Sequence, residues 1–89
     1  MRGVIQLLDI RHEPNENDVL MLEWLGHYDM PILIVATKAD KISRGARQKH
    51  LQAINRKLNL ESDFKPIIFS AHTGEGTDKL QAAIEEIIG

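Results

Sequence analysis

Three short apolar runs, spaced about thirty residues apart, constrain the fold of this chain more than any other feature. They cover residues 4–8, 32–36 and 66–69, and a segment with helical periodicity follows each of them. Near-continuous apolar runs of this length are typical of strands that are covered on both faces of a parallel sheet. The alternation therefore predicts an α/β fold of the βαβαβα type, with a three-stranded parallel sheet and three helices.

The first helical segment is unusually rich in apolar residues. Asn15 and Asp18 resemble a capping box with a shorter acid, and the helix that they start is expected to run to about Gly26. Because the apolar residues are so many, core packing is the expected role of Leu20 and Trp24. The alternative is an exposed apolar patch that binds a partner.

The second and third helices have clear starting residues. Ser43 is a good N-cap for a helix that is expected to end near Leu58. Thr77 or Asp78 starts the last helix, whose apolar residues keep the spacing of a single buried face. With right-handed connections and adjacent strands in chain order, the first two helices cover one face of the sheet and only the third covers the other. Bare apolar sheet is therefore expected near the first strand, where Gln6 is expected to be half exposed.

The composition excludes a disulfide-rich protein and a thiolate metal site. The 89 residues are 43% hydrophobic and 27% charged, with a formal net charge of −2 and no cysteine. The lack of cysteine fits a reducing cytoplasm, which is the expected location. No apolar run approaches the ~20 residues that span a bilayer, so no membrane segment is expected.

Basic residues are concentrated in the second helical segment. Residues 41–57 hold six cations and no acid: Lys41, Arg44, Arg47, Lys49, Arg56 and Lys57. Such a helix can bind RNA phosphates with a salt-dependent affinity. A solvated basic face is the plainer interpretation. The four histidines are scattered through the sequence and show no metal-ligand spacing.

Polar turns follow the second and third apolar runs where each strand ends. The first turn is Thr37-Lys38-Ala39-Asp40, and the second is Ser70-Ala71-His72. Asp9 ends the first strand in the same way. Ligands of open parallel sheets bind outside the carboxyl ends of the strands, so we expect these residues to share one edge.

The two turns together suit a guanine base. Guanine presents two donors side by side, N1–H and the N2 amine, and one carboxylate such as Asp40 can accept from both. The stem of Lys38 can lie over the base, and a backbone N–H near Ala71 can donate to O6. Thr37 and Ser70 are expected to brace the two loops against each other. Each motif alone is common by chance, but the pair at the ends of consecutive strands favours guanine recognition.

A phosphoacceptor or receiver-like domain is a further interpretation of this edge. Asp9 would be the acceptor, with Thr37 and Ser70 nearby. The sequence lacks the acidic pair that would hold magnesium and a lysine at the end of the third strand. A two-aspartate phosphatase site fails in the same way, because Asp9-Ile10-Arg11 has no second carboxylate.

Taken together, these motifs resemble the EngB/YihA-type bacterial GTPases, P-loop proteins of the Era-like group. The resemblance spans nearly the whole chain and rests on Arg2-Gly3-Val4, Leu8-Asp9-Ile10-Arg11-His12, Glu23-Trp24-Leu25, Thr37-Lys38-Ala39-Asp40-Lys41, Ser43-Arg44-Gly45 and Phe69-Ser70-Ala71. It implies that residues 1–89 are the C-terminal half of a GTPase (G) domain, with the last three strands of its Rossmann-like sheet. It also implies a role in large-ribosomal-subunit assembly and cell division. The implied GTP/GDP-binding residues are Thr37, Lys38, Asp40, Ser70, Ala71 and His72.

The phosphate-binding motifs of such a domain do not occur in this sequence. It contains no Gly-x-x-x-x-Gly-Lys-Ser/Thr and no Asp-x-x-Gly, so Mg²⁺ is expected only in the complete parent domain. The chain alone is expected to bind guanine nucleotide weakly and not to hydrolyse GTP. Thr37 stands where most GTPases carry Asn, and the lost amide group favours a lower base affinity. His72 stands where Lys is usual in the wider class.

The resemblance also bears on the partners of the chain. A ribosomal subunit or rRNA is expected to contact Lys41, Arg44, Arg47 and Lys49. Met1 directly before Arg2-Gly3 favours a truncated piece of a longer protein. The first strand, residues 4–9, would then have an open edge, which is expected to self-associate or to be covered by a rearranged helix.

Overall fold

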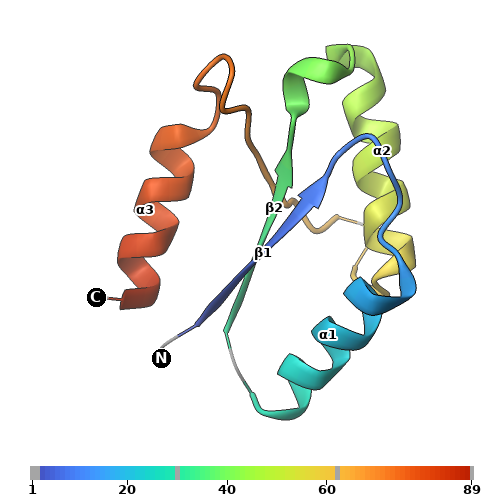
Figure 1. The fold of residues 1–89 in the computed structure, drawn as a ribbon, viewed down its shortest axis with the longest axis vertical. Coiled ribbons are helices and arrows are strands. Elements are labelled where there is room, and N and C mark those ends of the chain that lie inside the picture. Colours follow the sequence, from blue (N-terminus) through green and yellow to red (C-terminus); the bar gives the residue numbers. More distant parts are fainter. Residues whose placement is uncertain (1–2, 30, 62, 89) are drawn as a thin grey trace.

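The computed structural model describes residues 3–29, 31–61 and 63–88, which form a three-stranded parallel sheet with helices on both faces (Figure 1). Met1 and Arg2, which the sequence places at the entrance of the first strand, lie outside the described residues. The strands follow one another across the sheet in chain order: β1 (Val4–Asp9), β2 (Ile32–Thr37) and β3 (Ile67–Ile68). The expected α/β fold is confirmed, although β3 is shorter than its apolar run.

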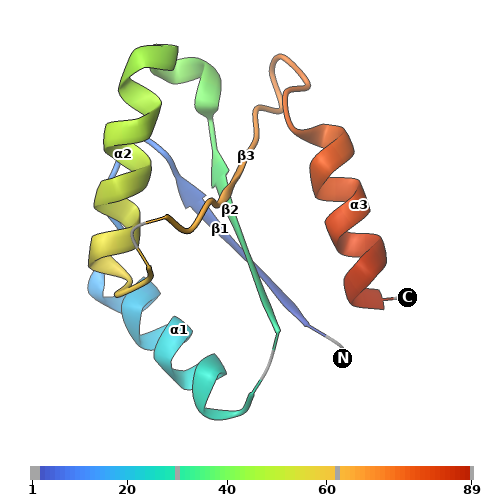
Figure 2. The ribbon, with the colours of Figure 1, turned by 180° about the vertical axis from the view of Figure 1, so that it is seen from behind.

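The helices occupy the two faces unequally. Their bounds are α1 (Glu16–His27), α2 (Arg44–Lys57) and α3 (Thr77–Ile88). Helices α1 and α2 cover one face, and α3 lies on the other (Figures 1 and 2). This is the arrangement that right-handed connections require. Among the described residues, no helix combines the length and the apolar character of a membrane span.

Both expected helix caps are present. The side chain of Asn15 accepts a hydrogen bond from the backbone N–H of Asp18 at 2.9 Å, and the carboxylate of Asp18 accepts from the N–H of Asn15 at 3.0 Å. The hydroxyl of Ser43 accepts from the N–H of Ala46 at 3.2 Å. These contacts satisfy N–H groups that have no partner within the helix, which is why α1 and α2 begin where they do.

The core lies between the sheet and helices α1 and α2. Its buried members are Leu8, Ile10, Ile34, Ala36, Leu51, Ile54 and Leu58. Within β1, Gln6 and Leu8 are buried on this face and Ile5 and Leu7 are exposed on the other, because successive side chains of a strand point to opposite faces. Full burial of an aliphatic side chain contributes roughly 1.5–3 kcal/mol, so this one layer supplies much of the stability of the domain.

The other face of the sheet is covered incompletely. Val35, in the central strand, is fully buried, whereas Ile5 is 40% exposed and Leu7 is 63% exposed. Helix α3 packs against the residue before β1, where a Cβ on Gly3 would collide with the side chain of Ile87. The expected bare apolar sheet near β1 is therefore confirmed, and no rearranged helix covers Ile5 or Leu7 among the described residues.

Two expectations about individual side chains are wrong. Leu20 is 59% exposed and Trp24 is 58% exposed, because α1 turns Leu25, Leu22 and Val19 to the sheet instead. Gln6, expected to be half exposed, is buried, and its Nε2 donates to the backbone carbonyl of Asp18 at 3.3 Å. Its Oε1 has no partner among the described residues.

Candidate functional site

A cavity of about 520 Å³ opens beside the carboxyl ends of the strands. Its walls are Arg11, Thr37, Lys38, Asp40, Lys41, Phe69, Ala71 and His72. Five of the six residues expected to bind a nucleotide are among them. The sixth, Ser70, is fully buried behind the wall. The structure thus brings all six together at one edge, as the order of the strands requires.

Asp40 is oriented by Ser70 rather than by a basic residue. The Ser70 hydroxyl donates to Asp40 Oδ1 at 2.7 Å and accepts from the N–H of Thr73 at 3.2 Å. This hydrogen bond is the main reason that the pKa of Asp40 lies below its usual range. Lys41 Nζ lies 3.9 Å from Oδ2 and adds a weaker electrostatic contribution. Asp40 is therefore a fixed carboxylate at neutral pH.

The backbone at this turn is strained in one place. Lys38 has a left-handed conformation, with φ +61° and ψ +35°, directly before the 3₁₀ turn Ala39–Lys41 that carries Asp40. Such a conformation is uncommon for a residue with a side chain and is concentrated at binding sites. The N–H of Ala39 donates to the carbonyl of Phe69 at 3.1 Å, which holds this turn against the loop after β3.

The expected brace between Thr37 and Ser70 is not formed. Thr37 Oγ1 donates to the carbonyl of Leu8 at 3.2 Å, so it links β2 to β1. Ser70 uses its hydroxyl on Asp40 instead. The reason is that Thr37 belongs to β2 itself and reaches sideways across the sheet, whereas Ser70 lies directly under the carboxylate of the neighbouring turn.

The carboxylate of Asp9 forms salt bridges with two basic side chains that line the cavity. The guanidinium of Arg11 donates from Nη2 to Oδ2 at 2.8 Å and from Nε to Oδ1 at 3.1 Å, and Lys38 Nζ lies 3.7 Å from Oδ2. The hydrogen bond from Arg11 is the largest cause that holds the pKa of Asp9 far below its usual range. With both oxygens engaged, Asp9 is poorly placed to act as a phosphoacceptor.

An ion pair that the sequence reasoning missed joins α2 to both site loops. Arg47 Nη1 donates to Glu75 Oε2 at 2.6 Å, and Nη2 donates to Glu75 Oε1 at 2.8 Å and to the carbonyl of Ala39 at 3.2 Å. The pair raises the pKa of Arg47 and lowers that of Glu75. One guanidinium therefore fixes the turn before Asp40 and the loop after Ser70 relative to each other.

The expected role of Arg47 on an RNA-binding face is wrong. Its side chain is only 12% exposed, because it points toward Glu75 and not to solvent. A signal in the sequence could have shown this: Arg47 lies four residues before Leu51 and seven before Ile54, on the buried face of α2. Lys57 is also engaged, and its Nζ donates to Glu16 at 3.0 Å.

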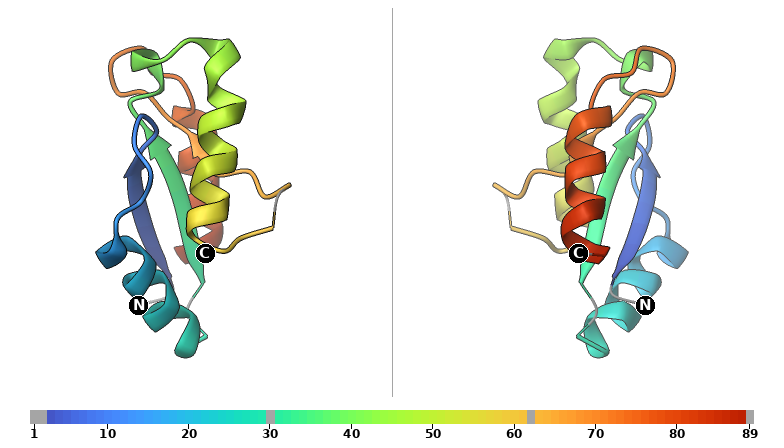
Figure 3. Two further views of the ribbon diagram at one scale, coloured as in Figure 1. Left: turned by 90° about the vertical axis from the view of Figure 1, so that its right-hand side faces the viewer. Right: turned by 90° about the vertical axis from the view of Figure 1, so that its left-hand side faces the viewer.

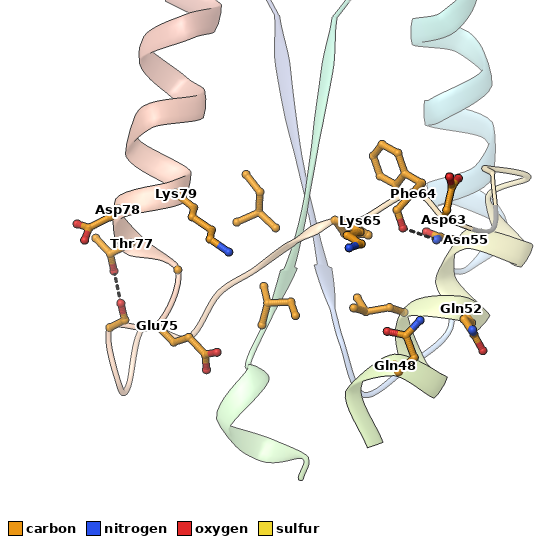
Figure 4. Close-up of a pocket in the computed structure, with 16 residues that line it drawn as sticks. Gln48, Gln52, Asn55, Asp63, Phe64, Lys65, Glu75, Thr77, Asp78 and Lys79 are labelled. Atoms are coloured by element: carbon orange, nitrogen blue, oxygen red, sulfur yellow. Dashed lines mark hydrogen bonds between the residues drawn. The ribbon is translucent and has the colours of Figure 1, made fainter. Parts of the chain in front are cut away.

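A second cavity, of about 840 Å³, lies between α2, β3 and α3 (Figure 4). Gln48, Gln52 and Asn55 line it from one helix, and Thr77 and Lys79 line it from the other. None of the residues that line the smaller cavity lines this larger one. We place the candidate site at the smaller cavity, because the residues predicted to bind a nucleotide line it and because the Asp40 carboxylate on its wall is not paired with a guanidinium, as Glu75 of the larger cavity is. In the described part of the chain, no group of three or more metal-ligating side chains converges.

Several curated proteins that are similar to this chain share one name. The chain is 57% identical over 88 residues to the "Probable GTP-binding protein EngB" of Syntrophomonas wolfei and 46% identical over 88 residues to that of Geobacillus sp. (strain WCH70). It is 49% identical over 87 residues to that of Symbiobacterium thermophilum. These matches cover 99%, 99% and 97% of the chain but 45%, 46% and 37% of the relatives.

The matched region is the C-terminal half of these proteins, and the chain spans less than half of their length. No family model matches the chain. The resemblance to EngB that the motifs predicted is confirmed by these identities.

Proposed function

We propose that this chain, the counterpart of the C-terminal half of EngB proteins, recognises the guanine base of GTP or GDP in the cavity beside Asp40. The observation that carries the proposal is the Asp40 carboxylate, ionised and held by Ser70 on the wall of that cavity. The name of the relatives, GTP-binding protein, supports the same ligand class.

The chemistry favours guanine over adenine. Each carboxylate oxygen has two acceptor positions, so Asp40 keeps capacity for N1–H and the N2 amine while it accepts from Ser70. Adenine offers an unprotonated N1 and no N2 amine at this place, so a carboxylate would face a lone pair. Lys38 lines the cavity and can cover the base with its stem, and the N–H of Ala71 can donate to O6. Thr37 and His72 complete the wall.

The affinity of these 89 residues for a nucleotide should be low. The sequence has no P-loop motif, so the phosphates and Mg²⁺ find none of their usual partners in it. Base contacts alone correspond to a dissociation constant of about 1 mM or weaker, or about −4 kcal/mol. For the same reason we expect no GTP hydrolysis by the chain alone, which a phosphate-release assay would check.

A chemical-shift titration with GMP, IMP and AMP tests the proposal. Inosine lacks the N2 amine and adenine lacks both donors, so the response should decrease in the order GMP, IMP, AMP, with the largest shifts at Asp40 and Ala71. Asp40→Ala should abolish the difference between the three, whereas Glu23→Ala, at an exposed acid on α1, should not. An equal response to AMP, or micromolar GTP binding, would contradict the proposal.

RNA binding by α2 is a second candidate function. Three cations of this helix are exposed and form no salt bridge among the described residues: Arg44, Lys49 and Arg56. Lys41 is exposed beside them and lies 3.9 Å from Asp40. We propose that rRNA phosphates bind here. Because the cations of α2 would neutralise these phosphates, the affinity for RNA should fall as the salt concentration rises.

Paired charge reversals test this second function. The double variant Lys49→Glu/Arg56→Glu should weaken RNA binding and reduce its dependence on salt concentration. The variant Glu85→Lys/Glu86→Lys makes a charge change of the same size on exposed residues of α3 and should leave the α2 contribution in place. RNA binding that does not weaken between low and moderate salt would refute the proposal.

We further propose that the complete protein is a cytoplasmic GTPase that acts in large-subunit assembly and cell division, as the family resemblance implies. Co-sedimentation of the complete protein with ribosomal subunits, with and without GTP, tests that role. Co-sedimentation to the same extent with and without GTP would argue against it.

A further inference from the structure

The carboxylate of Asp40 depends on neighbouring elements for its direction. It belongs to the 3₁₀ turn Ala39–Lys41, which lies with the loop after β3 and the start of α2 at one end of the molecule (Figure 3). So short a turn makes few hydrogen bonds of its own. Contacts with the other two segments must therefore fix the direction in which the carboxylate points.

The loop after β3 is closed around Ser70. The N–H of Ser70 donates to the carbonyl of Glu75 at 3.0 Å, and its carbonyl accepts from the N–H of Gly74 at 2.8 Å. Its hydroxyl accepts from the N–H of Thr73 at 3.2 Å and donates to Asp40 Oδ1 at 2.7 Å. The backbone of Glu75 therefore helps to place the hydroxyl that holds Asp40.

The side chain of Arg47 closes a ring of hydrogen bonds that includes both segments. It donates to the two carboxylate oxygens of Glu75 at 2.6 and 2.8 Å and to the carbonyl of Ala39, the residue before Asp40, at 3.2 Å. From Ala39 the ring continues through Asp40 and Ser70 and returns to Glu75. Charge-assisted hydrogen bonds of this kind are stronger than neutral ones. Removal of the guanidinium would open the ring at two points.

The ion pair itself lies outside the wall of the smaller cavity. Neither Arg47 nor Glu75 is among the residues that line that cavity. Glu75 instead lines the larger cavity, on the loop that leads to α3 (Figure 4). A base bound beside Asp40 would therefore touch neither side chain, and the pair can act on the base only through the position of Asp40.

We propose that Arg47 and Glu75 are positioning residues that set the preference of the site for guanine over adenine. The proposal rests on the proposed function of the Asp40 cavity. A carboxylate that accepts from N1–H and from the N2 amine at once must point in a narrow range of directions, because hydrogen bonds weaken steeply as they bend. Binding groups that act in this way must be held in place before the ligand arrives.

Loss of the ion pair should act on guanine and adenine differently. Without the ring, the Asp40 carboxylate has to be ordered when the base binds, and that ordering lowers the affinity for guanine. Adenine has no donor for the carboxylate, so its weaker binding gains nothing from the fixed position of Asp40. The ratio of the two association constants therefore reports the positioning role.

Chemical-shift titrations of the 89-residue chain with GMP and AMP test the proposal. Arg47→Met removes the guanidinium and keeps an unbranched side chain, and it should lower the ratio of the GMP and AMP association constants by about threefold to tenfold. Arg47→Lys should give a value between those of the wild type and Arg47→Met, because one ammonium group cannot reproduce the planar fork. Glu75→Gln should lower the ratio less, since the amide oxygen can still accept from Arg47.

Lys57→Met is the matched control. It removes the other ion pair of α2, in which Lys57 Nζ lies 3.0 Å from Glu16 at the far end of the helix, and it should leave the ratio unchanged. Urea unfolding of each variant separates a positioning role from a purely structural one. A structural role would lower the free energy of unfolding without changing the ratio.

Hydrogen exchange without nucleotide gives an independent readout of the ring. Relative to the amide of Val35 in the central strand, the Ser70 amide should exchange at least about fivefold faster in Arg47→Met than in the wild type. Unchanged exchange of Ser70 would overturn the proposed ring.

The outcomes of the titrations separate this inference from the proposed function. If the wild type prefers GMP and Arg47→Met keeps that preference in full, the positioning role is wrong and guanine recognition by Asp40 stands. If the wild type does not prefer GMP, the proposed function is wrong and the positioning role is wrong with it. If Arg47→Met does not fold, the same ratio measured for Arg47→Lys and Glu75→Gln decides the question.

Discussion

Replacement of Gly76 by alanine tests how firmly the loop after β3 is held. Gly74 and Gly76 have φ angles of +83° and +82°, so alanine at either position costs roughly 1–2 kcal/mol of backbone strain. Their surroundings differ: a Cβ on Gly74 meets nothing within 4 Å, whereas a Cβ on Gly76 overlaps the carbonyl oxygen of Ile68. Relief of that overlap requires a shift of paired backbone in β3, which adds roughly 1–3 kcal/mol.

We therefore expect Gly76→Ala to lower the free energy of unfolding by about 2–5 kcal/mol and Gly74→Ala by about 1–2 kcal/mol. Urea unfolding followed by circular dichroism measures both. Gly45→Ala is the control, because Gly45 lies in α2 with open space around its Cβ position, and the change should stabilise the chain by up to about 1 kcal/mol. Equal losses for Gly74→Ala and Gly76→Ala would refute close packing of the loop on β3.

Three further substitutions examine the caps and ion pairs. Asn15→Ala should lower the free energy of unfolding by about 0.5–2 kcal/mol by removing the cap of α1, and an unchanged urea midpoint would contradict the capping contacts. Arg11 lowers the pKa of Asp9, so the stability lost in Arg11→Gln should be full above about pH 4 and should shrink as pH falls and Asp9 protonates; a loss independent of pH would count against this ion pair. Glu75→Gln should lower the urea midpoint and shift the Ala39 amide signal by weakening the hold of Arg47, whereas Glu23→Gln should change neither.

Local signals predicted the order and type of the helices and strands correctly, although β3 is shorter than its apolar run. The capping box at Asn15 and the hydroxyl of Ser43 act within one turn, so their partners are close in sequence and can be read from it. The distribution of the helices and the bare face near β1 followed from chain connectivity: once the strands are assumed to be adjacent in chain order, right-handed connections leave only one arrangement of the three helices.

Long-range contacts account for what the sequence did not predict. Ser70 meets Asp40 across thirty residues, and Arg47 meets Glu75 across twenty-eight. The periodicity of α2 does not indicate that Arg47 pairs with an acid in a distant glycine-rich loop. The α1 error has a different cause: nearly every face of that helix is apolar, so the sequence does not indicate that Trp24 faces solvent.

The most direct test of the central claim is a change of base preference at Asp40. Xanthine carries a carbonyl where guanine has the N2 amine, so an amide side chain can donate to xanthine where the carboxylate accepts from guanine. Chemical-shift titrations of wild type and Asp40→Asn with GMP and xanthosine monophosphate should show that the wild type prefers GMP and the variant prefers xanthosine monophosphate. If Asp40→Asn keeps the wild-type preference, Asp40 does not contact the base and the proposed pocket is wrong.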